Sequence, residues 1–424
     1  MPSVLRNRTY RHLFTAQVVA LVGTGLATVA LGLLAYDLAG ADASAVLGTA
    51  LAIKMLAYVL IAPLATALAD RVSRRALLVS MDLIRACVAL ALPFVTQVWQ
   101  VYALILLLQA ASAAFTPTFQ ATVPEVLPDE RDYTRALSLS RLAYDLESLF
   151  SPVLAAALLS LVRYAWLFTG TAVGFAASAA LVVSVLLPTP RPTAGPSDPR
   201  PRRQVLRGTR LLLATPALRA LLALDLAVAA AGALVLVDTV VLVRGPLGRP
   251  AGDVPLALGA YGAGSMAVAL LLPRVLDRTV TERALMPAAG GVLTAALAVC
   301  AAGLALGPGA WAWPALLVAW AVIGAASSAV LTPGGRVLRR SVAPGDLPAA
   351  FAARFSLTHA CWLLTYPLTG WLTARTGPAA ATGALTVLAL AGSLLARRLW
   401  PRTDPVPEPQ ADRAGQAGRT GAVV

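Results

Sequence analysis

Several strongly apolar segments of this chain contain ionisable side chains. Lys54, the one lysine beside 33 arginines, lies near the middle of such a segment, as do Glu147, Asp145 and Asp225. A charge at the centre of a bilayer costs about 2.5–3.5 kcal/mol on insertion scales, so these groups should face a cavity or a partner. A buried carboxyl group can exchange a proton near neutral pH, and an ionised one can bind a cation. We therefore expect proton or cation binding at these positions.

Each of these residues also has a structural interpretation. Asp225 could form an ion pair with Arg219, and Lys54 and Glu147 could be inert partners in packed helix interfaces. Asp82 and Arg85 are three residues apart, so on a helix they can neutralise each other, and we expect that pair to be structural.

A second group of candidates follows helical spacing. His359, Trp362 and Tyr366 share one helix face. That face could be an aromatic wall for a flat, lipophilic ligand, or a helix interface with satisfied polar tips. His359 and Cys361 differ by about 200° on a regular helix, so they point to opposite faces and are not expected to share a metal ion. The sequence predicts no metal site.

A charged hinge lies between two apolar runs and is repeated. The stretch Asp70-Arg71-Val72-Ser73-Arg74-Arg75 has a weaker copy, Asp277-Arg278-Thr279-Val280-Thr281-Glu282-Arg283, 207 residues later. Two further similarities have nearly the same offset, namely Thr116-Pro117 with Thr332-Pro333, and Arg141 with Arg354. These repeats predict two parallel halves related by an axis along the membrane normal.

Composition indicates what positions these groups. The chain is 58% hydrophobic and 13% charged, which suits a lipid-facing surface. The net charge of +14 lies between apolar runs and not on a soluble module, so no nucleic-acid partner is expected. Lone spans in lipid must satisfy their own backbone hydrogen bonds, so we predict an all-α membrane protein. The twelve predicted transmembrane helices are 13–37, 45–69, 76–96, 99–121, 138–162, 165–187, 216–243, 255–275, 284–307, 311–333, 349–374 and 378–400.

The basic residues then give orientation and domains. Nearly all arginines between spans fall on one side, and the positive-inside rule makes that side, with both termini, cytoplasmic in a multi-pass protein of the cell membrane. Cys87, Cys300 and Cys361 lie inside spans and imply no disulfide. The predicted domains are an N-terminal six-helix bundle at 1–187, a cytoplasmic linker at 188–213, a C-terminal six-helix bundle at 214–400 and a disordered tail at 401–424.

The first hinge resembles the signature loop of the major facilitator superfamily, G-x-x-x-D-R-x-G-R-R. Asp70, Arg71, Arg74 and Arg75 match, whereas Thr66 and Ser73 replace the glycines. The chain looks closest to the drug:proton antiporter branch that contains macrolide and enterobactin exporters. The matching stretches are Tyr36-Asp37-Leu38-Ala39-Gly40, Phe115-Thr116-Pro117-Thr118-Phe119-Gln120 and Val123-Pro124-Glu125-Val126-Leu127-Pro128.

Two positions depart from that branch. Many drug antiporters carry a proton-linked arginine in helix four, where this chain has Gln109 as its polar residue. Their helix-five motif G-x-x-x-G-P-x-x-G-G here keeps Pro152, while Ser or Ala replaces the glycines. Small residues still permit close helix packing.

The resemblance implies a major facilitator fold, in which helices one, four, seven and ten line the cavity, and Asp225 is then the best-placed candidate. It also implies that the hinge residues, with Asp277 and Arg278, form a conformational latch, although a purely topological role explains their charges too. We expect export of small amphiphilic compounds by proton antiport and alternating access. A divalent-metal exporter for nickel or cobalt and a non-transporting scaffold or sensor are the alternatives.

The remaining expectations concern partners. No phosphate-binding loop, zinc-protease motif or nucleophile elbow occurs in the sequence, so we expect neither an enzyme nor a cofactor. The expected partners are a small-molecule substrate, protons and membrane lipid, and the protein is expected to be a monomer.

Overall fold

The computed structural model describes residues 4–69, 73–185, 187, 201–276, 281–307, 309–343 and 346–400. Every element in these ranges is helical. The predicted tail at 401–424, and most of the predicted linker, lie outside the described residues. Each of the twelve predicted segments coincides with a long helix or, for 216–243, with a helix interrupted by one π-helical turn. The all-α fold expected from the sequence is therefore confirmed.

The N-terminal bundle contains six long helices and three short 3-10 turns. Its elements are η1 (Val4–Arg6), α1 (Arg8–Ala39), η2 (Gly40–Asp42), α2 (Ala43–Ala69), α3 (Arg74–Ala91), η3 (Leu92–Phe94), α4 (Val98–Val126), α5 (Glu130–Leu159) and α6 (Ala165–Val183). Within it, α1 packs on α5 and α6, and α3 packs on α4 and α6.

The C-terminal bundle has the same number of long helices. Its elements are α8 (Pro216–Ala233), η4 (Leu234–Asp238), α9 (Thr239–Arg244), α10 (Asp253–Leu276), α11 (Glu282–Leu306), α12 (Ala312–Leu331), α13 (Gly334–Ser341), α14 (Leu347–Thr376) and α15 (Pro378–Leu399). The stretch α8–η4–α9 is one span that widens into a π turn over residues 234–238. Such turns are rare and occur often at functional sites.

Local sequence explains where several helices begin and end. The Asn7 and Ser73 side chains cap α1 and α3 by accepting the backbone N–H groups of Tyr10 and Ala76. At the other end of α1, Gly40 has φ of +52°, a conformation that few residues other than glycine adopt readily. The chain then turns through η2 directly into α2.

Nine stretches of the described residues are long and apolar enough to cross a membrane, one of which runs through α1, η2 and part of α2. Helices α5 and α14 are not among these nine. They are the helices that carry Glu147 and His359.

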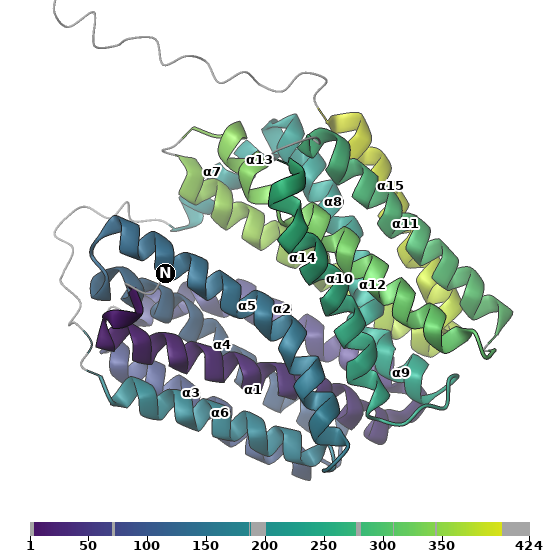
Figure 1. The fold of residues 1–424 in the computed structure, drawn as a ribbon, viewed down its shortest axis with the longest axis horizontal. Helices are drawn as coiled ribbons and strands as arrows, with labels where there is room; N and C mark the ends of the chain where they lie inside the picture. Colours follow the sequence, from purple (N-terminus) through teal and green to yellow (C-terminus); the bar gives the residue numbers. More distant parts are fainter. Residues whose placement is uncertain are drawn as a thin grey trace, which may run out of the picture.

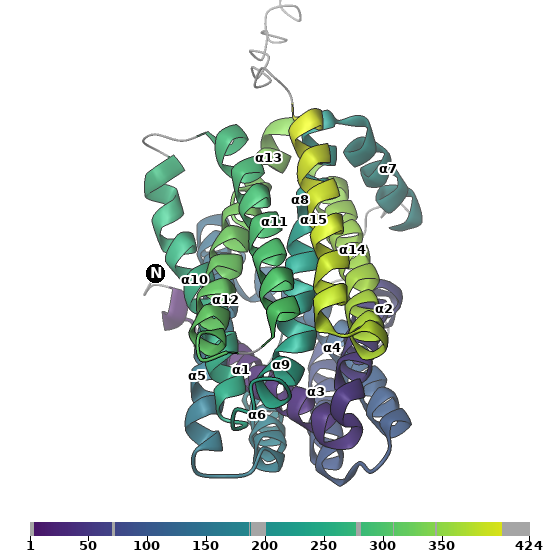
Figure 2. The same ribbon diagram turned by 90° about the vertical axis from the view of Figure 1, so that its right-hand side faces the viewer.

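The two bundles lie side by side and are tilted relative to each other (Figures 1 and 2). Between them, α2 packs on α14 and α5 packs on α10. Figure 1 shows the bundles meeting near α9 and diverging toward α7 and the N-terminus.

The predicted linker contains a helix that the sequence analysis did not anticipate. Residues Pro201–Ala214 form α7, with proline at its first position, and α7 packs against α14. Leu212 is buried, and Arg207 forms an ion pair with Asp346 at 2.7 Å. Its apolar residues lie on one helix face among the arginines, so a helical pattern is present, but it is short and lies in a stretch rich in proline and arginine.

Candidate functional site

The bundles close on each other at the end of the molecule that holds Gly40 and Asp238, which we call the closed end. Gly48 of α2 and Gly370 of α14 let the two backbones approach, because a Cβ atom at either position would collide with the other helix. The Trp371 indole N–H donates to the Thr49 hydroxyl at 2.9 Å across the same contact. Gly32 of α1 likewise admits the side chain of Val240.

The opposite end holds Arg8, Arg74 and Arg336, and we call it the basic end. Toward this end the two bundles diverge (Figure 1). Leu60 of α2 is 57% exposed and Phe355 of α14 is 49% exposed, although each belongs to a helix that packs on the other at the closed end. The bundles are thus in close contact at one end and diverge at the other.

Glu147 and His359 both lie within electrostatic range of Lys54, between these two ends. Lys54 of α2 interacts electrostatically with Glu147 of α5 and with His359 of α14, so the group joins both bundles. We call these three residues the central cluster. The Glu147 carboxylate lies against α1, where a Cβ atom on Gly25 would be 2.7 Å from its Oε1 atom and would also collide with Ser151. Only glycine at position 25 leaves room for both side chains.

Aromatic rings surround the histidine of this cluster. The His359 ring lies 3.9 Å from the Phe355 ring and 6.1 Å from Tyr58 of α2, and its Nδ1 atom is 2.7 Å from the Phe355 carbonyl oxygen. If that nitrogen is protonated it donates to the carbonyl, which leaves Nε2 as the proton acceptor.

The expected aromatic face of α14 divides into two stacks. The Trp362 and Tyr366 rings lie 5.0 Å apart, and Trp362 packs on Gly232 of α8. His359 instead turns toward Tyr58 of α2, which the sequence analysis did not single out. Residues on one helix face still differ in their angle around the helix axis. On α14 that difference is enough for some of them to contact α2 and others to contact α8.

Asp225 forms an ion pair inside the C-terminal bundle. Its side chain has no exposed surface, and its oxygens lie 3.5 Å from the guanidinium of Arg354 on α14. The Thr358 hydroxyl donates to Oδ2 at 3.0 Å. The expected alternative, an ion pair between Asp225 and Arg219, is wrong, because the partner is Arg354. Arg219 is exposed and lines an outer groove together with Cys361.

The Asp82–Arg85 pair is more extensive than its local spacing predicts. The Arg85 guanidinium bonds Asp82, and the Ser178 hydroxyl of α6 donates to the other carboxylate oxygen at 2.7 Å. The same guanidinium lies over the rings of Phe115 and Phe175 at 4.2 and 4.4 Å. Both charged residues are buried, so this cluster ties α3, α4 and α6 into one unit.

Only part of the predicted latch can be described. Asp70, Arg71, Asp277 and Arg278 lie outside the described residues. Arg74, at the start of α3, forms an ion pair with Glu125 near the end of α4 at 2.8 Å. Arg75 donates to the backbone carbonyl of Val183 at the end of α6.

The C-terminal half has a corresponding pair with the charges exchanged. Glu282, 208 residues after Arg74, begins α11 and forms ion pairs with Arg336 and Arg340 of α13 at 3.2 and 3.3 Å. In the first half, the base lies on the third span (α3) and the acid on the fourth (α4). In the second half, the acid lies on the third span (α11) and the bases lie on α13, the helix after the fourth span. A comparison of residue types alone does not reveal the correspondence, because the signs are opposite.

The other candidates lie outside the central cluster. Gln109 is half-buried in α4, and the Asp145 side chain is not among those described. His359 and Cys361 face α2 and the outer groove respectively, so their expected divergence is observed. Within the described ranges, no group of three or more His, Cys, Asp and Glu residues could hold a metal ion.

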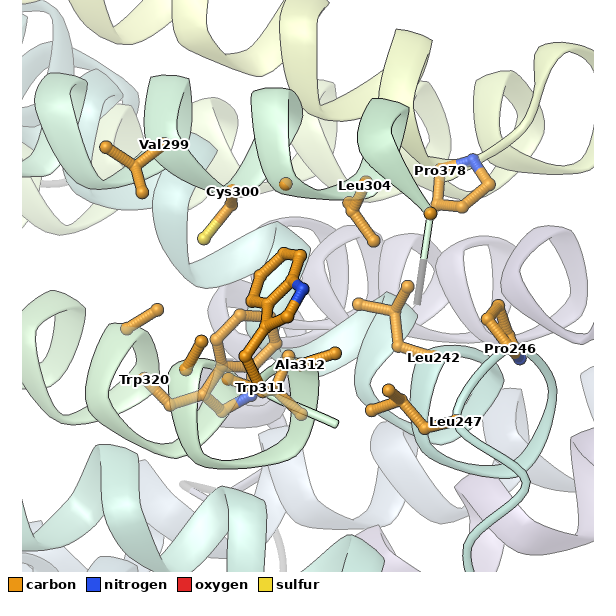
Figure 3. Close-up of a pocket in the computed structure, with 15 residues that line it drawn as sticks. Leu242, Pro246, Leu247, Val299, Cys300, Leu304, Trp311, Ala312, Trp320 and Pro378 are labelled. Carbon is orange, nitrogen blue, oxygen red and sulfur yellow. The ribbon is translucent and has the colours of Figure 1, made fainter. Parts of the chain in front are cut away.

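A well-formed pocket lies away from the cluster, inside the C-terminal bundle (Figure 3). Its volume is about 260 Å³, and Trp311, Trp320, Leu242 and Leu304 are among its apolar walls. The Trp320 indole N–H donates to the Thr239 hydroxyl at 2.8 Å, so one wall of the pocket adjoins the π turn. None of the central cluster residues lines it.

Comparisons with known proteins agree with this architecture. The family model described as Major Facilitator Superfamily matches residues 13–313. Among curated proteins there is no match.

Solved transporter structures resemble the whole fold. One is a bacterial homologue of the human lysosomal transporter Spinster, inward-facing and unoccupied, with a TM-score of 0.70 at 14% identity, covering 94% of this chain and 99% of that one. The nucleoside transporter NupG gives 0.68 at 14% identity, covering 92% and 98%. A POT family transporter in complex with 5-aminolevulinic acid gives 0.68 at 11% identity, covering 93% and 97%.

At these identities the structural matches establish the fold alone, whereas the family model matches well over half of the sequence. The matched residues run from the first predicted span to the start of α12, and so include the N-terminal bundle and about half of the C-terminal one. The chain therefore belongs to the Major Facilitator Superfamily and is a transporter, not an enzyme.

Proposed function

We propose that this protein exports small amphiphilic organic compounds, cationic or neutral, in exchange for protons. The observation that carries the proposal is the central cluster, in which Lys54 lies within electrostatic range of Glu147 in its own bundle and of His359 in the other. Ionisable groups at mid-span are costly in a membrane protein, and they mark proton and ion pathways in transporters.

The cluster offers a simple exchange reaction. When Glu147 is ionised, it neutralises Lys54, and a proton on Glu147 removes that attraction. Loss of the attraction leaves the charge of Lys54 uncompensated beside His359 of the other bundle. This changes the relative energy of conformations that hold the two bundles together to different extents, which is the requirement for coupling. Each proton moving inward gains roughly 2.3 kcal/mol per 100 mV of membrane potential.

The surface that widens toward the basic end suits an amphiphilic substrate. Tyr58 and Phe355 contribute rings beside His359, and Phe351 and Phe355 of α14 are exposed. Mostly apolar walls with few fixed charges favour broad specificity. Asp225 is assigned a structural role in this proposal, because Arg354 already neutralises it.

The orientation rests on the positive-inside rule. With the basic end and both termini in the cytoplasm, the described conformation is open to the cytoplasm and closed to the outside, as an exporter must be to load substrate. The domain boundaries of the sequence analysis and the latch formed by the hinge residues are part of the same proposal. A monomer is sufficient for it.

Proton flux in proteoliposomes tests the proposal. The purified protein is reconstituted with a pH-sensitive dye inside, and ethidium or the macrolide erythromycin is added as the probe. Export by antiport predicts proton movement opposite to the probe, abolished in Glu147→Gln and retained in Asp42→Asn, an exposed carboxyl at a helix junction. Probe movement without proton movement would refute antiport.

The same vesicles separate the alternatives. Movement of Ni²⁺ or Co²⁺, with no movement of either organic probe, would favour a divalent-metal exporter. No flux of any of these, with unchanged cellular function in Glu147→Gln, would favour a scaffold or sensor.

A further inference from the structure

Asp238 is a buried acidic residue that the proposed exchange reaction does not use. It ends the π turn η4, and its side chain is 0% exposed. Because η4 packs against α2 of one bundle and α14 of the other, Asp238 lies within the contact that seals the closed end.

Only one of its carboxyl oxygens has a hydrogen-bond partner among the described residues. The Thr373 hydroxyl of α14 donates to Oδ2 at 2.8 Å, whereas Oδ1 has none. The Ser44 hydroxyl of α2 lies beside the carboxyl group, is also buried, and also makes no hydrogen bond within the described ranges. Thr373 belongs to the same bundle as Asp238, but Ser44 belongs to the other.

No charged group in the part of the chain that the structure describes interacts with Asp238, whose side chain is influenced only by burial, Ser44 and Thr373. The Arg244 guanidinium lies over the Tyr36 ring, and that of Arg375 lies over Trp371. Further ionisable groups on the packed elements also interact elsewhere, among them Lys54 on α2, Asp225 on α8, Asp253 and Tyr261 on α10, Arg354, His359 and Tyr366 on α14, and Arg397 on α15.

We propose that Asp238 is a second proton-binding site, occupied when the bundles close around it and vacated to water when they separate. A buried carboxylate without a counter-charge is strongly disfavoured, and neutralisation is the usual outcome. In the closed state, the proton bound to Oδ1 is donated to the Ser44 oxygen, while Thr373 continues to donate to Oδ2. Opening this end hydrates the carboxyl group, which then releases its proton to the water outside.

This assignment deepens the proposed proton coupling and rests on it, because it makes closure of the outer side depend on proton uptake from that side. A matched contrast comes from Asp225, which is equally buried but has Arg354 as a counter-charge. The positive charge of Arg354 therefore stabilises Asp225 as an ionised carboxylate. Asp238 has no counter-charge of this kind among the described residues.

Cysteine accessibility tests the assignment without requiring transport. In a background with Cys87, Cys300 and Cys361 replaced by serine, Val240→Cys places a thiol where Val240 packs on Gly32 at the closed end. Its rate of labelling by a membrane-impermeant maleimide is measured from pH 5 to 9. Each rate is divided by that of an exposed Thr376→Cys reporter, which corrects for thiol ionisation.

The expected result is a normalised rate that rises several-fold with pH, with a limit of about tenfold per unit for one linked proton. Asp238→Asn should keep the rate low at every pH, because a neutral amide mimics the protonated acid. The control Asp253→Asn, at the same end but paired with Arg249 at 2.6 Å, should preserve the rise.

Either of two outcomes would overturn the assignment. One is a labelling rate that still rises with pH in Asp238→Asn. The other is a labelling rate that does not change with pH when Asp238 is present, a result that can be obtained even if the Asp238→Asn variant does not fold. Normal accessibility behaviour with no proton flux on addition of ethidium would instead refute the exchange of protons for organic compounds and leave the site in place.

Discussion

Removing either partner of the Asp225–Arg354 pair should destabilise the protein much more than removing both. The two groups lie 3.5 Å apart, with 0% and 15% of their side chains exposed. At that distance and an effective dielectric constant of about 20, the gross attraction is about 5 kcal/mol. Much of this only offsets the desolvation of two charges, so the net value of the pair is small.

A single substitution leaves one buried charge without compensation. We expect Arg354→Gln to cost about 3–5 kcal/mol, the range for breaking a buried pair. Asp225→Asn should cost less, because Thr358 can still donate to the amide oxygen and the Arg354 side chain retains some exposure to solvent. The double variant should recover most of the loss.

The assay is equilibrium unfolding of all four proteins in the same mixed micelles, together with transport by each. A structural pair predicts that the stability loss of the double variant is well below the sum of the two single losses, and that the double variant transports substantially. Two results would refute this reasoning: single-variant losses that simply add in the double variant, or a stable Asp225→Asn protein that folds normally but no longer transports. The second would make Asp225 a substrate or proton site.

Three further predictions follow from other parts of the molecule. Exchanging Arg74 and Glu125 should be tolerated better than Arg74→Glu alone, measured as transport rate, because the second half already uses the reversed polarity. The two side chains are only 16% and 29% exposed, so Arg74→Glu should lower stability by more than the ~0.2–1 kcal/mol of an exposed pair. Gly264→Ala should sharply reduce the melting temperature in detergent, because its Cβ would collide with the backbone of the facing helix, whereas Gly383→Ala, in open space, should be neutral or stabilising. Asp70→Asn should reduce transport with expression unchanged; normal transport would remove the latch hypothesis.

Much of the fold could be predicted because lipid imposes it. Apolar segments of spanning length must be helices, so composition and length alone gave the twelve spans. Helix α7 was missed because its short amphipathic pattern lies in a stretch rich in proline and arginine, which is typical of a linker; the helix packs on α14.

The site was predictable in its residue types but not in its partners. The cost of a mid-span charge indicated Lys54, Glu147 and Asp225 individually. Which charge meets which depends on the packing of whole bundles, so the choice of Arg354 over Arg219 for Asp225 could not be read from spacing. Glycines such as Gly25, which make room for a carboxylate, carry no chemical signal of their own.

The central claim is that the two bundles tilt about the cluster and expose it to one side at a time. Pulsed electron–electron double resonance, which measures distances between spin labels, tests this in the cysteine-free background with two spin-label pairs. One pair, at Asp42 and Thr376, spans the closed end, and the other, at Arg8 and Arg339, spans the basic end. On addition of ethidium or a change of pH, the account predicts that the first distance lengthens while the second shortens. Distances that stay fixed, or that change in the same direction at both ends, would contradict it.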